Sequence, residues 1–295
     1  DGNIVVFQSD ATNLDANDMS TEDSVYVANR SANTLEVLLN PAGNAIQAAT
    51  DPVVSGPGNF IAFTCDDASV IPGDTEGKRD ILVYDTAADS YGRVSETAAG
   101  TGADAACYDP AISEHGNVIS FGTLAANLIA GDMRGETDIY YNLNPLATYQ
   151  PDLRIGKKRA LSSHKGNNRY NTSGSGQKQT LKLKGRKKGR IYLSGQNDGN
   201  ITTGLKLRLP KVPKSKRFRY KFFRLTGGKR NIKAAVKRSG FVSAEVTTGA
   251  TITYRFECKR KGNRKSRYNG KPTLTSTGDT SGKRDVAKMK IVAKP

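Results

Sequence analysis

Several residue types on which binding and catalytic sites depend are scarce in this chain. Its 295 residues include no tryptophan, only two histidines, His115 and His164, and only three cysteines. No C-x-x-C pair is present, so the sequence offers no zinc-binding pattern. It also contains no run of about 18 apolar residues, which excludes a transmembrane helix.

The sequence motifs of common enzyme families are missing as well. The P-loop, the H-E-x-x-H zinc motif and the G-x-S-x-G nucleophile motif are all absent. His115 precedes a turn glycine and corresponds to Pro57 in an internal repeat, so we interpret it as a turn residue. We therefore predict a protein that is not an enzyme and carries no cofactor, with calcium as the one ion to consider.

The charged residues are divided very unevenly along the chain. Residues 1–150 contain five Lys and Arg against 22 Asp and Glu, a net charge of −17. Residues 151–295 contain 40 Lys and Arg against six Asp and Glu, a net charge of +34. Charge of this size governs association and solubility rather than fold. Each half either is simply solvated or meets a partner of opposite charge.

The first half contains a repeat of 56 to 58 residues. Its signature is Gly-Asn-x-(Ile/Val)-x-Phe with an aspartate 16 residues after the glycine, and it begins at Gly2, Gly58 and Gly116. A further strand is predicted after each aspartate, over residues 24–28, 81–85 and 139–143. With Asp-Pro-x-(Ile/Val)-Ser before the glycine and a short stretch such as 91–95 at the end, each unit has four predicted strands. Such units are typical of propeller blades, since one blade cannot bury its own faces.

These motifs resemble the TolB-like (WD40-like PD40) β-propeller repeats of secreted and periplasmic bacterial proteins. The resemblance covers residues 1–145 and implies a partial propeller of about two and a half blades. The first copy lacks its first strand and the third lacks its last. We therefore expect the closing part of a larger propeller, completed by upstream blades or by another chain. The resemblance implies no ligand, because this fold hosts many functions.

Acidic loops follow the repeat aspartates and have two interpretations. Calcium favours several oxygen ligands on one turn, and the candidate ligands are Asp74, Glu76, Asp80, Asp132 and Asp138. Alternatively, these carboxylates cap turns through local hydrogen bonds. The second interpretation is favoured by the cations within the loops, which are Lys78, Arg79 and Arg134.

The cysteines also leave two possibilities open. Cys65 and Cys107 flank neighbouring inner strands of the repeat, so they form either a disulfide or two buried free thiols. Cys258 lies in a basic stretch without an obvious partner.

The second half begins after a linker at residues 146–151 and covers residues 152–295. Strict alternation of apolar and polar residues runs through it, as in Leu205-Lys206-Leu207-Arg208-Leu209, which is the period of a half-buried strand. About eight such strands with intervening turn residues predict an antiparallel β-sandwich. The half resembles the immunoglobulin-like modules near the C-termini of bacterial secreted proteins, on Pro151-Asp152-Leu153-Arg154-Ile155, residues 170–177, residues 196–200, residues 273–276 and Asp285-Val286.

The outward faces of these strands are the candidate binding surface. Cations alternate with core residues there, and such ladders attract polyanions or the acidic region of another subunit. The residues that we select are Lys182, Lys184, Lys206, Arg208, Arg217, Arg219 and Lys221. The aromatics Phe218, Tyr220 and Phe222 alternate with the last three and are expected in the core. We do not expect nucleic acid as a specific target, since no RRM signature is present.

Together these features favour an extracellular or cell-surface structural protein. Acidic and basic domains of successive subunits would meet head to tail, and such contacts give filaments or layers when they do not close. The first alternative is an adhesion module that binds an anionic polymer or glycan. The second is an accessory part of an extracellular hydrolase whose site lies upstream.

Overall fold

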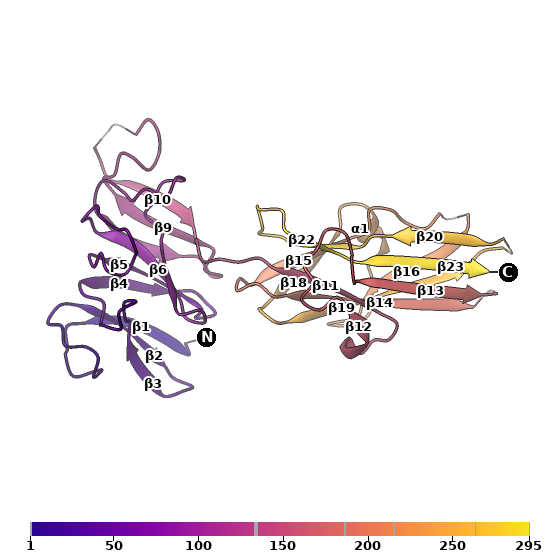
Figure 1. Ribbon diagram of the computed structural model, residues 1–295, viewed down its shortest axis with the longest axis horizontal. Helices are drawn as coiled ribbons and strands as arrows, with labels where there is room; N and C mark the ends of the chain where they lie inside the picture. Colours follow the sequence, from indigo (N-terminus) through magenta and orange to yellow (C-terminus); the bar gives the residue numbers. More distant parts are fainter. Residues whose placement is uncertain (1, 133–134, 186, 215, 263, 295) are drawn as a thin grey trace. The chain divides into compact units, whose positions relative to one another are not determined.

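The computed structural model describes residues 2–132, 135–185, 187–214, 216–262 and 264–294. As predicted, the protein is all-β, and within these ranges it has one helix, α1 (Lys233–Lys237), and one short 3-10 turn, η1 (Leu161–Ser163) (Figure 1). The chain divides into two compact units, Asp1–Ala147 and Thr148–Pro295, and the boundary between them lies inside the segment given above as a linker. No helix within the described ranges is long and apolar enough to cross a membrane.

The first unit contains one antiparallel sheet for each sequence repeat. Its strands are β1 (Ile4–Ser9), β2 (Ser24–Asn29), β3 (Thr34–Val37), β4 (Ala49–Val54), β5 (Phe60–Cys65), β6 (Asp80–Asp85), β7 (Ser90–Arg93), β8 (Cys107–Ile112), β9 (Val118–Thr123) and β10 (Asp138–Leu143). The sheets have the orders β1-β2-β3, β4-β5-β6-β7 and β8-β9-β10 (Figure 1). The second repeat therefore has all four predicted strands.

In the second and third repeats, the repeat signature forms the hairpin between the first two strands. In the second repeat, the Ser55 hydroxyl donates to the Asn59 side chain at 3.0 Å and accepts from the Phe60 amide at 3.1 Å. Ser113 makes the same two contacts in the third repeat. Gly58 has φ +79°, a conformation in which side chains are strained, and so the turn selects glycine.

Successive repeats pack through a recurring junction. Val25 on β2 is buried in one cluster with Ile61 and Phe63 on β5 of the next repeat. A Cβ added to Gly58 would lie 2.6 Å from Ile4 of the first repeat, and one added to Gly116 would lie 2.5 Å from Phe60 of the second. The same sequence positions therefore make both junctions, which explains why the glycine recurs.

Of the two possibilities left open for Cys65 and Cys107, the structure has buried free thiols rather than a disulfide. Cys65 accepts a hydrogen bond from the Asp67 amide at 3.3 Å, and the Cys107 thiol faces the Ala105 carbonyl at 3.7 Å. Each sulfur is thus satisfied by its own turn, which spacing in a repeat could not reveal.

The second unit contains three sheets. Its strands are β11 (Pro151–Gly156), β12 (His164–Lys165), β13 (Lys178–Lys184), β14 (Lys188–Asn197), β15 (Thr203–Arg208), β16 (Phe218–Arg224), β17 (Arg230–Asn231), β18 (Phe241–Val246), β19 (Thr251–Arg260), β20 (Ser266–Gly270), β21 (Thr273–Ser276), β22 (Arg284–Val286) and β23 (Lys288–Lys294). Their orders are β12-β11-β14-β19-β16-β17, β13-β23-β20 and β18-β15-β21-β22. One core joins the three sheets, including Leu183, Leu193, Leu205 and Ile291.

This unit is not wholly antiparallel, which corrects the sequence prediction. β13 pairs with β23 in parallel along its whole length, from Lys178 opposite Lys288 to Lys184 opposite Lys294 (Figure 1). Alternation along a strand predicts its two faces but not the direction of its partner. These two strands are also far apart in the sequence, so no tight hairpin fixes their direction.

Buried polar residues fix the start of this unit. The fully buried Asp285 carboxylate accepts from the Leu153 amide at 2.8 Å, the Asn171 amide at 3.1 Å and the Gln177 side chain at 2.6 Å. One carboxylate thereby connects β11, the loop before β13, and β22. Burial raises the pKa of Asp285 despite these donors.

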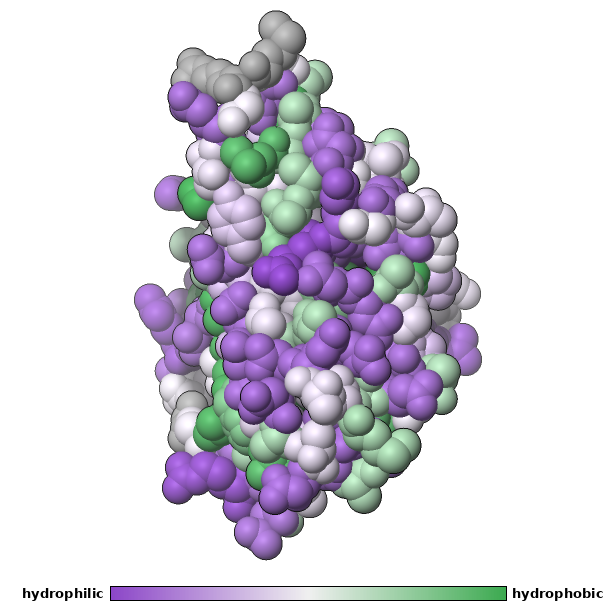
Figure 2. All heavy atoms as spheres, turned by 90° about the vertical axis from the view of Figure 1, so that its left-hand side faces the viewer, coloured by the Kyte–Doolittle hydropathy of each residue, from purple (hydrophilic) through white to green (hydrophobic). Residues whose placement is uncertain are grey.

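One face of the protein is largely polar. Figure 2 shows this face, on which most residues are hydrophilic and the hydrophobic ones form small, separate groups. Single exposed apolar side chains on this face must therefore be judged by their neighbours.

Candidate functional site

The seven cations selected from the sequence lie on three different sheets. Three groups result, namely Lys182 and Lys184 on β13, Lys206 and Arg208 on β15, and Arg219 and Lys221 on β16 with Arg217 just before that strand. They therefore do not form one site. Phe218 and Phe222 are in the core as predicted, and Tyr220 packs against its edge.

One groove, the β13 groove, collects cations that the sequence did not single out. It has a volume of about 970 Å³ and follows residues 178–182 along the outer side of β13. Its charged lining, within the described ranges, consists of Lys157, Lys158, Lys165, Lys178, Lys182 and Arg190, without a carboxylate. Of the seven predicted cations, only Lys182 lies in this groove.

The charge of the β13 groove is almost uncompensated. Among the described residues, its only ion pair joins Arg190 to Glu257, at 3.4 Å, and its five lysines contact no carboxylate. β13 is also an edge strand of its sheet. Its outer backbone groups therefore lie beside the lysine side chains, and the groove offers both charge and hydrogen-bonding groups to an anion.

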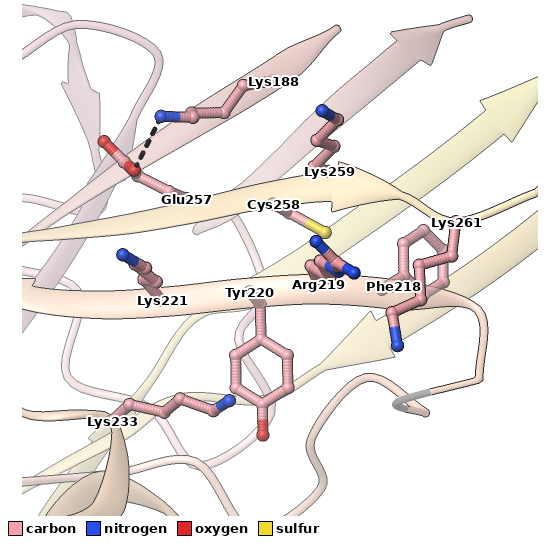
Figure 3. A pocket seen from close by; sticks show the side chains of 10 residues that line it. All are labelled: Lys188, Phe218, Arg219, Tyr220, Lys221, Lys233, Glu257, Cys258, Lys259 and Lys261. Atoms are coloured by element: carbon pink, nitrogen blue, oxygen red, sulfur yellow. Dashed lines mark ion pairs between the residues drawn. The ribbon is translucent and has the colours of Figure 1, made fainter. Parts of the chain in front are cut away.

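A second groove, the β16 groove, has a volume of about 400 Å³ (Figure 3). Its cations are Lys188, Arg219, Lys221, Lys233, Lys259 and Lys261. Its floor is apolar, because Phe218, Tyr220 and Cys258 also line it. The Lys233 amine lies 4.4 Å from the centre of the Tyr220 ring, a cation–π contact that positions this lysine at the rim.

Among the residues that the structure describes, Glu257 is the only carboxylate in the lining of the β16 groove. It lies directly opposite Arg190 on β14 and Lys221 on β16 in the strand register. Its oxygens lie 3.5 Å from Lys188, 3.4 Å from Arg190 and 3.0 Å from Arg255. Figure 3 shows its ion pair with Lys188. One buried carboxylate thus holds several cations together and leaves the groove strongly positive.

The thiol and the imidazole near these grooves are buried or engaged in hydrogen bonds. Burial raises the pKa of the Cys258 thiol to about 12, so it remains a weakly nucleophilic thiol at neutral pH. His164 Nδ1 lies 2.9 Å from the Ser194 hydroxyl, but its other nitrogen faces the Lys158 carbonyl at 2.9 Å. Ser194 is fully buried, so this pair is not open to a substrate.

The proposed calcium ligands of the second repeat converge on an arginine rather than on an ion site. Arg93 lies 3.1 Å from Glu76, 3.5 Å from Asp74 and 3.6 Å from Asp80. The guanidinium occupies the centre of these carboxylates and supplies the positive charge. In the part of the chain that the structure describes, no cluster of three acidic, histidine or cysteine side chains could hold a metal.

The other two calcium candidates have no shared site either. Asp132 accepts a hydrogen bond from the Tyr140 hydroxyl, as Asp18 does from Tyr26 at 2.5 Å in the first repeat. Asp138 is exposed at the start of β10, opposite Thr123. Among the described residues, these carboxylates do not come together at one ion site, which favours the interpretation that they act through local contacts.

In the second repeat, an arginine rather than a tyrosine is the partner of the repeat aspartate. In the first repeat, Tyr26 lies directly across from Val37, and in the second the equivalent cross-strand pair is Leu82 and Arg93. Leucine cannot donate to the aspartate, and the arginine on the next strand instead forms an ion pair with Asp74 at 3.5 Å. The sequence contained this signal as leucine at the position of a recurring tyrosine, together with Arg93, one of only four arginines in an acidic half.

Comparison with known proteins identifies no family. No protein-family model matches the chain, and no curated protein is significantly similar to it. Among solved structures, it is similar to a family 123 glycoside hydrolase from Clostridium perfringens at 9% identity and a TM-score of 0.31, over 49% of this chain and 27% of that one.

Two other solved structures illustrate the range of these similarities. The CooA pilin subunit from enterotoxigenic Escherichia coli matches at 10% identity and a TM-score of 0.27, over 48% of this chain and 97% of the pilin. The β-propeller domain of the trilobed protease from Pyrococcus furiosus matches at 11% identity and a TM-score of 0.27, over 97% and 94%. Since all three scores are below 0.5, they carry no argument about activity.

Proposed function

We propose that this is a non-enzymatic extracellular protein whose second unit binds an anionic polymer. The observation that carries this proposal is the β13 groove, where six cations line one surface without a carboxylate. Like charges repel one another, so a cluster of this kind is stabilised when an anion binds to it.

The shape of the groove favours a polymer over a small anion. Five consecutive residues of β13 line it, which corresponds to a length of roughly 16 Å. A lysine side chain carries a compact charge on a flexible stem. Several such side chains in a row therefore suit a ligand whose anionic groups are spaced along a chain. Specific recognition of bases is disfavoured because Phe218 and Phe222 are buried and offer no stacking surface. An acidic glycan fits best.

Heparin, used as a model acidic glycan, provides a direct test. We expect Lys178→Gln combined with Lys182→Gln to lower the affinity for heparin by about tenfold. The salt dependence of binding should also fall, because a protein that makes fewer contacts with the anionic groups releases fewer counterions when it binds. The matched control is Lys206→Gln with Arg208→Gln, which removes two cations outside both grooves. Equal losses in the two variants would show unspecific attraction to net charge and contradict the proposal.

We also propose a fold family for each of the two units. The first unit is proposed to be part of a TolB-like β-propeller, on its recurring four-strand pattern and hairpin turns. The second is proposed to be a bacterial immunoglobulin-like module, on its single core between sheets. Both assignments accord with secretion.

Head-to-tail assembly of acidic and basic units is a second candidate function. The observation that favours it is the opposite net charge of the two halves, −17 and +34. Association of this kind weakens with salt, because the Debye length falls to about 3 Å at 1 M ionic strength. Sedimentation at low and high salt tests it, and a monomer at low ionic strength would contradict it.

A further inference from the structure

Three cations of the β16 groove lie directly opposite one another on three neighbouring strands. Lys188 on β14 pairs with Lys259 on β19, and Lys259 pairs with Arg219 on β16. Residues paired in this way point to the same side of a sheet, and like charges in directly opposite positions destabilise it. All three residues are exposed and line the groove (Figure 3). We call these three residues the cation row.

The next row along the same strands has a carboxylate at its centre. Glu257 on β19 lies between Arg190 on β14 and Lys221 on β16. It is only 7% exposed, and its oxygens lie 3.4 Å from Arg190 and 3.5 Å from Lys188. Both rows thus have a cation on each outer strand. They differ at the centre, where the cation row has Lys259 and its neighbour has an anion.

The described part of the protein does not supply an anion to the cation row itself. Lys188 is drawn towards Glu257, while Lys259 and Arg219 make no ion pair with any described carboxylate. Lys221 and Lys261 line the groove on either side of the row and add further positive charge. Mutual repulsion among these side chains is relieved when an anion binds from solution.

All of these pairings lie within the second unit. The cation row is at the start of β14, where Lys188 lies opposite Lys259. The linker enters the unit at the other end of this ten-residue strand, roughly 30 Å away, where Asn197 lies opposite Pro151. The row therefore belongs to one sheet and is set by the register of its strands.

We propose that the cation row binds a soluble phosphate monoester, with the phosphate over Lys259 and between Lys188 and Arg219. This group carries about two negative charges at pH 7 and three acceptor oxygens, whereas a carboxylate or a sulfate ester carries one charge. The guanidinium of Arg219 can donate to two of these oxygens at once, and the lysines add point charges. The phosphate takes the position that Glu257 holds in the next row.

The remainder of the groove has room for the organic part of such an ester. Its volume of about 400 Å³ exceeds that of a phosphate group, and the half-buried Tyr220 and the lysine stems offer apolar contacts. A lipid fits less well, because insertion into a membrane needs exposed apolar side chains beside the phosphate site. Within the described ranges of the second unit, the large apolar residues that are exposed all lie outside this groove; they are Leu161, Tyr170 and Val242.

Isothermal titration calorimetry with phenyl phosphate tests the site. Lys259→Gln should weaken binding by about tenfold, because a charge-assisted contact is lost. Lys206→Gln, which removes a cation outside both grooves, should leave it unchanged. An equal loss in the two variants would show attraction to net charge alone and overturn the proposal.

The choice of ligand is tested with related probes. Phenyl sulfate has the same organic part with one charge and should bind about tenfold more weakly, and phenyl phosphate should itself weaken below about pH 6, where it takes up a second proton. Inorganic phosphate should bind more weakly than phenyl phosphate because it does not fill the groove. Equal affinity for either probe contradicts a phosphate monoester. Tighter binding to phosphatidylcholine vesicles that contain phosphatidic acid would point to a lipid and overturn the choice of a soluble ester.

A charge reversal separates loss of the site from loss of the fold. Lys259→Glu places a carboxylate at the centre of the cation row, so phenyl phosphate should no longer bind and the midpoint of urea unfolding should rise above that of the wild type. Lys206→Glu is the matched control, because Lys206 lies opposite Thr275 and Val242 rather than cations, and it should still bind. If Lys259→Glu still binds, or is less stable than the wild type, the proposal is wrong.

This inference is independent of polymer binding in the β13 groove. The variant that combines Lys178→Gln with Lys182→Gln should bind phenyl phosphate as the wild type does, since neither lysine lines the β16 groove. A loss of phenyl phosphate binding in that variant would place the anion in the β13 groove instead and contradict a separate site.

Discussion

Replacing Arg93 by methionine removes the guanidinium at the centre of the acidic loop in the second repeat. Its side chain is only 8% exposed, and its partners Asp74 and Asp80 are 8% and 5% exposed. The variant would leave two buried carboxylates without a compensating charge. Breaking a buried ion pair in this way costs about 3–5 kcal/mol, which for a unit of this size lowers Tm by about 10 °C.

The expected loss depends on pH in a defined direction. Burial raises the pKa of Asp80 to about 6, above its ordinary value of 3.8, and burial also raises that of Asp74. A carboxyl with a raised pKa favours folding below pH 3.8, and this contribution is lost as the pH rises through about 6. Since Arg93 lowers both pKa values, its removal raises them further. The variant should therefore be less impaired at pH 4.5 than at pH 7.

Urea unfolding followed by circular dichroism measures both effects. Arg79→Met is the matched control, because Arg79 makes one ion pair with Asp66, at 2.8 Å, and both side chains are about 40% exposed. Such exposed pairs contribute about 0–1 kcal/mol. Adding Asp80→Asn to the Arg93 variant should restore part of the stability. If Arg93→Met and Arg79→Met lower the free energy of unfolding by the same amount, Arg93 does not compensate the buried carboxylates of the loop.

Two further predictions concern the glycine junction and the thiols. Gly58→Ala should destabilise the first unit by about 2–4 kcal/mol, because the new Cβ would clash with Ile4 and the backbone would also be strained. The control is Gly43→Ala, at a similar φ of +83° with nothing within 4 Å of the new Cβ, which should cost about 1 kcal/mol. Urea unfolding checks this, and equal losses would contradict the packing. All three thiols are buried and have raised pKa values. Ellman's reagent should therefore react with none of them in the native protein at pH 8 and with all three in guanidinium. Rapid labelling of any one thiol in the native protein would contradict its burial.

The strands of the first unit could be predicted because glycine and asparagine recur at fixed positions. Each Gly-Asn pair marks a hairpin, so the spacing from Gly58 to Gly116 located β5 and β9 in advance. The partners of the aspartates could not be located in this way. They depend on which residue lies across the sheet, as Arg93 lies across from Leu82, and periodicity carries no information about register between strands.

In the second unit, alternation predicted which side chains face outward but not which strands are neighbours. Lys182 was selected for its own strand, yet its neighbours in the β13 groove come from β12, β14 and the turn after β11. Such a site depends on long-range topology, including the parallel pairing of β13 with β23. The sequence therefore predicted the kind of surface but not the groove.

The first repeat has the cross-strand pair Tyr26 and Val37, whereas the second has Leu82 and Arg93 at the same positions. This difference has a consequence for how such repeats diverge. Duplicated units remain interchangeable only while each supplies its own donor to its aspartate. The second repeat has Leu82 at the tyrosine position, so Arg93 is the partner of its aspartate, and replacing Arg93 alone would bury a bare carboxylate. Homologous sequences should therefore vary at positions 82 and 93 together.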